Sequence, residues 1–283
     1  MSKCPGIHSE RAGQAEACAS CPNSTYCQQT TNSSTITKSR IARNTAGKKI
    51  IAVMSGKGGV GKSTMCMQIA HALKKCCVLD FDVSGPSIAK MSGTENAIIT
   101  NVQDTFVPVH VHGTCIGVVS AYHVNEWHSV EQLYQPSFIS SFLINVLSNC
   151  NFDTYTHVVI DTPPGITDEH LIISNYVDAV CVLVSTPGVL AVNDLVRQID
   201  FCERAGVKVL GVVENMREFV CECGCVVPMG TVDVREVCLR RGVRYLGGLQ
   251  CVKAVGMFAD GGMVYEDALF AGVVRNITDE LEK

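Results

Sequence analysis

One run of residues has the types and the spacing needed to bind phosphate. It fits the pattern G-x-x-x-x-G-K-[ST] and continues with a threonine; in order, the residues are Gly56, Lys57, Gly58, Gly59, Val60, Gly61, Lys62, Ser63 and Thr64. In such loops, backbone N–H groups surround phosphate oxygens, the conserved lysine position reaches the β- and γ-phosphates, and the hydroxyl that follows ligates Mg²⁺. An apolar run, 50–54, precedes the loop, and apolar residues at helical spacing follow it. This strand–loop–helix context favours a nucleotide site over a glycine-rich turn without a ligand.

Carboxylates end two later apolar runs. Asp80 and Asp82 close the second run, and Asp161 closes the third. Ligands of an open parallel sheet bind beyond the carboxyl ends of its strands, so these groups should lie near the loop. We expect Asp161, Asp80 and the hydroxyl of Ser63 to hold Mg²⁺, and Asp82 to position the attacking water. For Asp80 and Asp82 the alternative is a turn-forming role.

Two further residues after predicted strands could contact the nucleotide. Gly165 can bring a backbone N–H near the γ-phosphate, which makes the loop after Asp161 a candidate nucleotide-sensing switch. Asn215 follows the fifth predicted strand, and its amide can read both the donor and the acceptor edge of adenine. A helix cap or turn is an equally good interpretation of Asn215.

Four cysteines near the start have the spacing of a metal site: Cys4, Cys18, Cys21 and Cys27. A C-x-x-C pair with two flanking cysteines suits structural Zn²⁺ or an iron–sulfur cluster, and spacing alone favours zinc. The segment has few apolar residues, so an inorganic centre would explain how it folds.

A second group, Cys221, Cys223 and Cys225, surrounds Gly224. Three cysteines do not complete a four-ligand site, and Cys238 is the nearest further one. A cluster shared across a twofold axis would complete the ligand count. Inert or zinc-binding surface thiols are the alternative. We interpret the remaining nine cysteines as small buried hydrophobes: Cys66, Cys76, Cys77, Cys115, Cys150, Cys181, Cys202, Cys238 and Cys251.

The elements that must position these residues alternate along the chain. Predicted strands cover 50–55, 77–81, 158–161, 179–185, 207–213 and 244–246; predicted helices cover 62–75, 136–149, 168–175, 190–205, 232–241 and 263–282. Such alternation predicts an α/β fold with a mostly parallel, doubly wound sheet of the P-loop NTPase type, and a β-hairpin is expected within 106–120. Three parts are expected: a cysteine-rich appendage (1–28), a flexible linker (29–48) and the P-loop domain (49–283).

Composition narrows the class of protein further. The chain has 283 residues and a formal net charge of −4, which disfavours a nucleic-acid-coating protein. No apolar run reaches the roughly 18 residues needed to span a bilayer, and the start has no signal-peptide or transit character. We therefore expect a cytoplasmic protein without nucleic-acid or membrane partners, in which a disulfide framework is not expected.

Lys57 narrows the class of P-loop protein that this chain resembles. With this second lysine, the loop is similar to the deviant Walker A motif of the MinD/ParA-type superclass. Within that superclass, residues 80–87, 161–170 and 213–216 resemble the Mrp/NBP family of iron–sulfur scaffold ATPases. The amino-terminal cysteine spacing resembles the eukaryotic cytosolic branch, whose members carry a stable 4Fe–4S cluster there. The resemblance covers essentially the whole chain and favours iron–sulfur over zinc.

This resemblance implies an ATPase that assembles 4Fe–4S clusters and transfers them to cytosolic and nuclear apoproteins. It implies a homodimer, or a heteromer with a related scaffold ATPase, in which Lys57 reaches the partner's nucleotide and a second 4Fe–4S cluster bridges the subunits. Iron–sulfur targeting factors and apoprotein recipients are the implied partners, and the nucleus is a further location.

The chain departs from the family pattern in two places. The family's second cysteine pair is C-x-x-C, but Gly224 stands three positions after Cys221. The ligand pair is therefore Cys221 with Cys225, Cys221 with Cys223, or Cys223 with Cys225, and we favour the last. After Trp127 the chain also lacks the family's Arg-Gly-Pro-Lys-like stretch.

Two other functions fit parts of the pattern. A MinD/ParA-like regulatory switch with structural zinc would need an amphipathic tail or a basic DNA-binding surface, and the acidic stretch 279–283 offers neither. An ATP-dependent electron-transfer protein resembling nitrogenase iron protein would share a cluster between subunits without requiring the amino-terminal cysteines.

Overall fold

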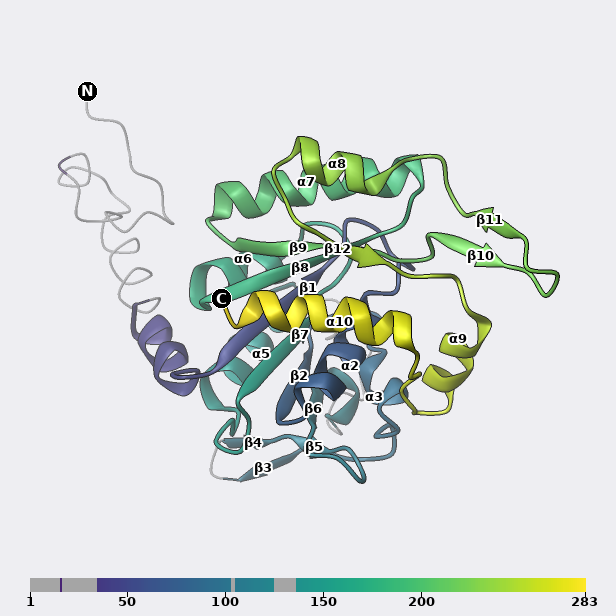
Figure 1. The fold of residues 1–283 in the computed structure, drawn as a ribbon. Coiled ribbons are helices and arrows are strands. Elements are labelled where there is room, and N and C mark those ends of the chain that lie inside the picture. Colours follow the sequence, from purple (N-terminus) through teal and green to yellow (C-terminus); the bar gives the residue numbers. More distant parts are fainter. Residues whose placement is uncertain (1–15, 17–34, 103–104, 125–135) are drawn as a thin grey trace.

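The chain is built around one eight-stranded sheet (Figure 1). The structure, a computed structural model, describes residues 16, 35–102, 105–124 and 136–283, without the side chains of 136–138. The strand order is β12-β9-β8-β1-β7-β2-β6-β5, and every neighbouring pair is parallel except β5 with β6. The strands are β1 (Lys49–Met54), β2 (Cys76–Asp80), β5 (Val109–His110), β6 (Gly117–Ser120), β7 (His157–Asp161), β8 (Ala179–Ser185), β9 (Lys208–Glu214) and β12 (Tyr245–Gly248). The predicted parallel α/β sheet is confirmed.

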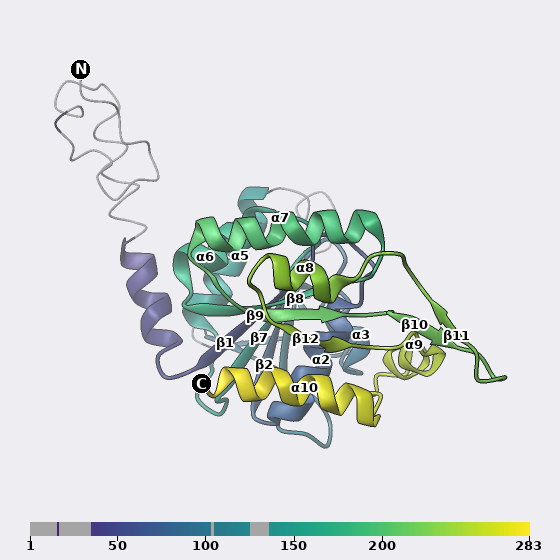
Figure 2. The same ribbon diagram turned by 45° about the horizontal axis from the view of Figure 1, so that its top comes forward.

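Helices cover both faces of the sheet (Figure 2). One layer contains α5 (Pro136–Asn149), α6 (Asp168–Tyr176), α7 (Val189–Ala205) and α8 (Val234–Arg240), and the other contains α2 (Lys62–Leu73) and α10 (Ala268–Leu281). Successive residues of β1 enter different cores: Ile50 packs with the first layer and Ile51 with the second. Side chains of a strand alternate between faces, so a strand buried on both faces has the continuous apolar run seen in the sequence.

The segment between β2 and α5 differs from the expected hairpin. The antiparallel pairing of β5 with β6 confirms part of it. However, β6 also lies parallel to β2 and so becomes part of the main sheet. The start of the expected hairpin belongs to β4 (Thr105–Val107), which pairs with β3 (Thr100–Val102). Short connections in this segment include α3 (Ile88–Met91) and a 3₁₀ turn, η2 (Ala121–His123).

The carboxyl-terminal third contains elements that the sequence did not indicate. A two-stranded ribbon, β10 (Glu218–Val220) with β11 (Val226–Pro228), extends away from the main sheet in Figures 1 and 2. Another is α9 (Lys253–Asp260). The helix expected from residue 263 begins only at Ala268, because the carboxylate of Asp267 accepts the backbone N–H groups of Leu269 and Phe270 as an N-cap.

Residues 35–44 form a helix in place of the expected flexible linker. Its Ile41 is fully buried in the sheet core, and the side chain of Asn44 donates to the carbonyls of Leu147 and Cys150 at 2.9 and 3.0 Å. The linker prediction was wrong here because the polar, threonine-rich composition of the segment gave no sign that one apolar side chain, that of Ile41, packs into the core. Among the described residues, no helix is both long and apolar enough to cross a membrane.

We predict that Ile41→Ala lowers the free energy of unfolding by about 2–4 kcal/mol, because it removes a fully buried side chain and leaves a cavity. Ile36 in the same helix is 63% exposed, so Ile36→Ala should change stability by less than about 0.5 kcal/mol. Urea titration measures both. Equal, small changes would show that this helix does not contribute to the fold.

Candidate functional site

The glycine loop connects β1 to α2 and depends on glycine for its backbone. Gly59 and Gly61 have positive φ angles of 78° and 89°, a region that other residues rarely adopt. A Cβ atom at Gly56 would collide with Asp194, and one at Gly61 would collide with the side chain of Asn215. The first turn of α2 contains no acidic residue. Its free N–H groups and positive dipole end therefore favour an anion in the loop.

Lys62 forms a buried ion pair with the carboxylate that ends β7. Its Nζ lies 2.8 Å from Oδ1 of Asp161 and 3.9 Å from Oδ2 of Asp82. Burial lowers the pKa of Lys62, but Asp161, Cys66 and Asp82 together outweigh that effect, with Asp161 contributing most, so the pKa of Lys62 is raised overall. The lysine therefore stays charged. Burial raises the pKa of Asp82, while Lys62 opposes this rise.

Asp80 lies on the neighbouring strand and is almost completely buried. Its Oδ2 accepts the backbone N–H of Ile88 at 3.2 Å and the hydroxyl of Ser120 at 3.0 Å. Burial, together with the negative charge of Asp161, raises the pKa of Asp80 well above its usual range. Sequence reasoning missed Ser120, which can be recognised only once β6 is known to pair with β2.

The oxygen atoms around this pair suit a hard divalent cation. Within the described residues, Oδ1 of Asp80 and Oδ2 of Asp161 are buried and have no hydrogen-bond partner. Buried acceptors are normally satisfied, so two orphaned carboxylate oxygens on register-paired residues of adjacent strands favour a cation such as Mg²⁺. Ser63, in the first turn of α2, lines a cavity of about 380 Å³ together with Lys62, Asp82 and Pro164.

Asn215 supports the glycine loop directly. Its Nδ2 donates to the carbonyl of Val60 at 2.8 Å, and its backbone N–H donates to Ser185. The closeness of the Asn215 side chain explains why position 61 must be glycine. Asn215 thus holds the loop in place, a role in addition to the predicted contact with adenine. Lys57 is exposed at the rim of the cavity, and within the described residues its ammonium group forms no ion pair. A free cation at this rim is available to a second molecule.

The second cysteine group lies at the turn of the β10–β11 ribbon. The Sγ atoms of Cys221, Cys223 and Cys225 all lie within 4.8 Å of one another. The turn is closed by backbone hydrogen bonds from Cys221 to Cys225 and from Gly224 to Cys221, with Gly224 at φ 82°. Cys221 and Cys223 are joined as a disulfide, a bond that was not expected, and within the described residues Cys225 is left as the free thiol of the group. Which two of the three sulfurs would ligate a cluster stays a prediction. The short turn, rather than the spacing, decides which sulfurs meet.

The other cysteines divide into two sets. Most are buried, as expected for small hydrophobes, but Cys115 is exposed and Cys251 is half-buried. Cys238 is 1% exposed within the sheet core, so it cannot serve as the fourth ligand of the ribbon group in this fold. Cys4, Cys18, Cys21 and Cys27 lie outside the described residues, as does the stretch after Trp127.

Comparison with known proteins assigns the chain to a family. The ParA family model, described as the NUBPL iron-transfer P-loop NTPase, matches residues 46–281. The chain belongs to this ParA family. It is 31% identical over 280 residues to the cytosolic Fe-S cluster assembly factor NBP35 of Eremothecium gossypii, in an alignment that covers 94% of this chain and 84% of the relative.

Solved structures of ParA-like proteins have the same fold. A nucleotide-binding protein from Archaeoglobus fulgidus, in complex with ADP, is 27% identical with a TM-score of 0.69, over 82% of this chain and 95% of that one. The septum site-determining protein MinD of Pyrococcus horikoshii, complexed with Mg-ADP, is 16% identical with a TM-score of 0.62, over 81% and 96% of the two chains. The predicted resemblance to MinD/ParA-type ATPases is confirmed at the level of family and fold.

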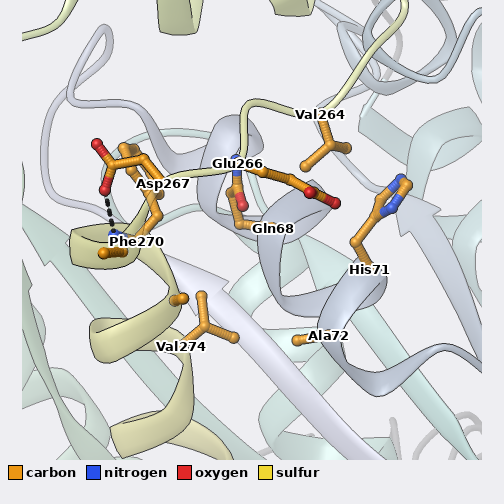
Figure 3. Close-up of a pocket in the computed structure, with 10 residues that line it drawn as sticks. Gln68, His71, Ala72, Val264, Glu266, Asp267, Phe270 and Val274 are labelled. Atoms are coloured by element: carbon orange, nitrogen blue, oxygen red, sulfur yellow. Dashed lines mark hydrogen bonds between the residues drawn. The ribbon is translucent and has the colours of Figure 1, made fainter.

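A second cavity of this ParA-family chain, about 490 Å³, lies between α2 and α10 (Figure 3). His71 and Gln68 of α2 line one side, and Glu266, Phe270 and Val274 line the other. It has no glycine loop, and its carboxylates disfavour phosphate. The larger cavity is therefore not the nucleotide site.

We predict that Lys62→Met destabilises the nucleotide-free protein by about 3–5 kcal/mol, because it leaves the carboxylate of Asp161 buried without its partner. Adding Asp161→Asn to Lys62→Met should recover part of this loss, since the unpaired charge is then removed. Lys57→Met is the control on the exposed lysine of the same loop and should change stability little. Urea titration without nucleotide measures all three. A Lys62→Met protein as stable as the parent would contradict the role of the ion pair.

Proposed function

We propose that this chain is an ATP-hydrolysing scaffold that assembles 4Fe–4S clusters and transfers them to cytosolic and nuclear apoproteins. The observation that carries the proposal is the presence, in one ParA-family chain, of a complete phosphate loop and a separate group of three cysteines whose sulfur atoms converge. The name of its relative from Eremothecium gossypii, a cytosolic Fe-S cluster assembly factor, supports the cargo and the cytoplasmic location. The archaeal relative solved with ADP supports a nucleotide at the loop.

The residues of the loop act together on ATP. Its backbone N–H groups and Lys62 bind the phosphates, and Asn215 reads the adenine. Ser63, Asp161 and Asp80 would hold Mg²⁺, which neutralises phosphate charge when bound. Asp82 is 17% exposed and 3.9 Å from Lys62, a position from which it orients the attacking water. Lys57 is exposed and reaches the γ-phosphate of the partner protomer in a dimer, formed with a second copy or with a related scaffold ATPase.

The thiols of the ribbon hold the cluster that is assembled. Each subunit would contribute two of Cys221, Cys223 and Cys225 as thiolates, so that a 4Fe–4S cluster bridges the dimer, and the Cys221–Cys223 disulfide must be reduced first. Cys4, Cys18, Cys21 and Cys27 would hold a second, stable 4Fe–4S cluster. Iron–sulfur targeting factors and apoproteins are the proposed recipients.

We predict that the reduced protein, purified anaerobically and reconstituted with iron and sulfide, binds both elements, and that Cys223→Ser/Cys225→Ser loses the transferable part of the cluster absorption. Cys115→Ser removes an exposed cysteine outside the ribbon and is the matched control. Cys18→Ser/Cys21→Ser should remove the stable part instead. Iron and sulfide analysis with Mössbauer spectra measures the outcome; zinc as the sole bound metal would instead support a regulatory switch.

We also predict that Lys57→Gln binds ATP with nearly unchanged affinity but hydrolyses it roughly 100-fold more slowly, because a charge that acts only on the transition state is lost. Cluster transfer to an apoprotein should slow in parallel. Phosphate release and transfer rates are measured on the same preparation. A Lys57→Gln protein that loads and transfers cluster at the parental rate would show that hydrolysis and cluster transfer are not coupled.

A further inference from the structure

Two buried side chains beside the loop after β7 have complementary groups that remain unused. His170 is in the first turn of α6 and is fully buried, and Gln198 is on α7 and is 1% exposed. Within the described residues, Nε2 of His170 and Oε1 of Gln198 have no hydrogen-bond partner. Leaving one buried polar atom unsatisfied costs roughly 1–3 kcal/mol, so two such atoms, one a donor and one an acceptor, next to the same loop require an explanation.

The hydrogen bonds of His170 fix the position of its proton. The backbone N–H of Thr167 donates to Nδ1 at 3.3 Å, and the hydroxyl of Thr167, 3.0 Å from the same nitrogen, is free to donate to it as well, so we assign Nδ1 as an acceptor. Burial, with a contribution from the charge of Lys62, lowers the pKa of His170 to about 4 and keeps the ring neutral. A neutral ring with an acceptor at Nδ1 carries its proton at Nε2. Nε2–H is therefore a buried donor.

Gln198 presents the matching acceptor. Its Nε2 donates to the carbonyls of Ser55 and Gly165, at 3.3 and 2.5 Å, and these two acceptors fix the orientation of the amide. Gly165 is two residues from Thr167, whose backbone N–H donates to the ring of His170. The ring of His170 also packs edge-on against Phe201, one turn along α7 from Gln198, with 6.1 Å between ring centroids. Both side chains therefore lie against the same short loop.

The backbone of Gly165 has a second possible partner in the loaded protein. Its N–H donates to the carbonyl of Ser55 at 2.9 Å. One N–H cannot serve both this carbonyl and the γ-phosphate, so contact with ATP requires Gly165 to leave Ser55. A movement that also withdraws the Gly165 carbonyl would leave the Gln198 amide held only by Ser55 and able to turn.

We propose that His170 and Gln198 are positioning residues that form an Nε2–H···Oε1 hydrogen bond when Gly165 moves from Ser55 to the γ-phosphate, and that this bond couples the loop to α7. The inference rests on the proposed ATP site. Forming the bond satisfies both orphaned groups only in the triphosphate state, so it contributes to discrimination between ATP and ADP.

A path of contacts leads from α7 toward the cysteine ribbon. Pro187 lies one residue before Gly188, the N-cap of α7, and its carbonyl accepts the backbone N–H of Val232 at 3.1 Å. Val232 follows β11, and Met229, at the end of that strand, donates its N–H to Arg217. A displacement of α7 is therefore passed to the strand that follows Cys225, which gives the nucleotide state a physical route to the thiols.

The test compares the affinities of a non-hydrolysable ATP analogue and of ADP by calorimetry. His170→Asn keeps an acceptor for Thr167 but loses the distant donor, whereas His170→Gln keeps a donor near the Nε2 position. We expect His170→Asn to weaken binding of the analogue roughly five- to tenfold with ADP affinity unchanged, and His170→Gln to stay within about twofold of the parent. Gln198→Met also removes the hydrogen bonds to Ser55 and Gly165, so it should weaken binding of the analogue at least as much, and the double variant should lose no more than Gln198→Met alone.

Several outcomes would overturn the inference. Equal losses for ADP and the analogue would indicate a purely structural role, as would additive losses in the double variant; an unchanged affinity ratio would show that the bond does not form. Amide hydrogen exchange over residues 188–205 and 217–232 provides a second measurement. The analogue should slow exchange there in the parent protein but not in His170→Asn. Should the parent protein bind neither nucleotide, the proposed ATP site itself would be wrong, an outcome distinct from the others.

Discussion

The buried charge at the carboxyl end of β1, β7 and β2 constrains the rest of the structure. One ammonium group, that of Lys62, lies beside Asp161 and near Asp82, and Asp80 stands on the adjoining strand. Negative charge in a site with little water is unfavourable unless cations or hydrogen bonds compensate for it. Lys62 and Ser120 compensate for part of it, and the unpartnered oxygens of Asp80 and Asp161 leave a place for a divalent cation. The charge distribution therefore favours a divalent cation at this edge of the sheet.

The glycine loop is held by segments that are distant in the sequence. Asn215 binds the carbonyl of Val60 from the end of β9, and Asp194 of α7 approaches Gly56 so closely that no side chain fits there. Gln198 of the same helix binds Ser55, just before the loop. A movement of α7 or of β9 therefore changes the position of the glycine loop directly, because the tightly packed loop has little room to adjust.

The glycine loop and the cysteine ribbon lie in different parts of the fold, but β9 and α7 connect them. The cysteine ribbon leaves the main sheet after β9, the strand that ends next to Asn215, and returns toward the start of α7 through Val232. Phe219 and Val227 are paired across the ribbon and remain 44% and 49% exposed. A two-stranded ribbon with exposed apolar residues is only marginally stable alone, which agrees with a role in contact with another subunit.

The sequence by itself determined the phosphate loop, the parallel sheet and the carboxylates that end its strands, because each depends on local pattern: glycine spacing, apolar runs and the residue that follows them. It did not predict the docking of residues 35–44, the ribbon, α9 or the pairing of Cys221 with Cys223. Nor did it identify Ser120, His170 and Gln198, whose hydrogen bonds or unused atoms involve partners far away along the chain. Only the tertiary structure brings those partners together, since burial and unsatisfied hydrogen bonds are properties of packed neighbours and not of sequence spacing.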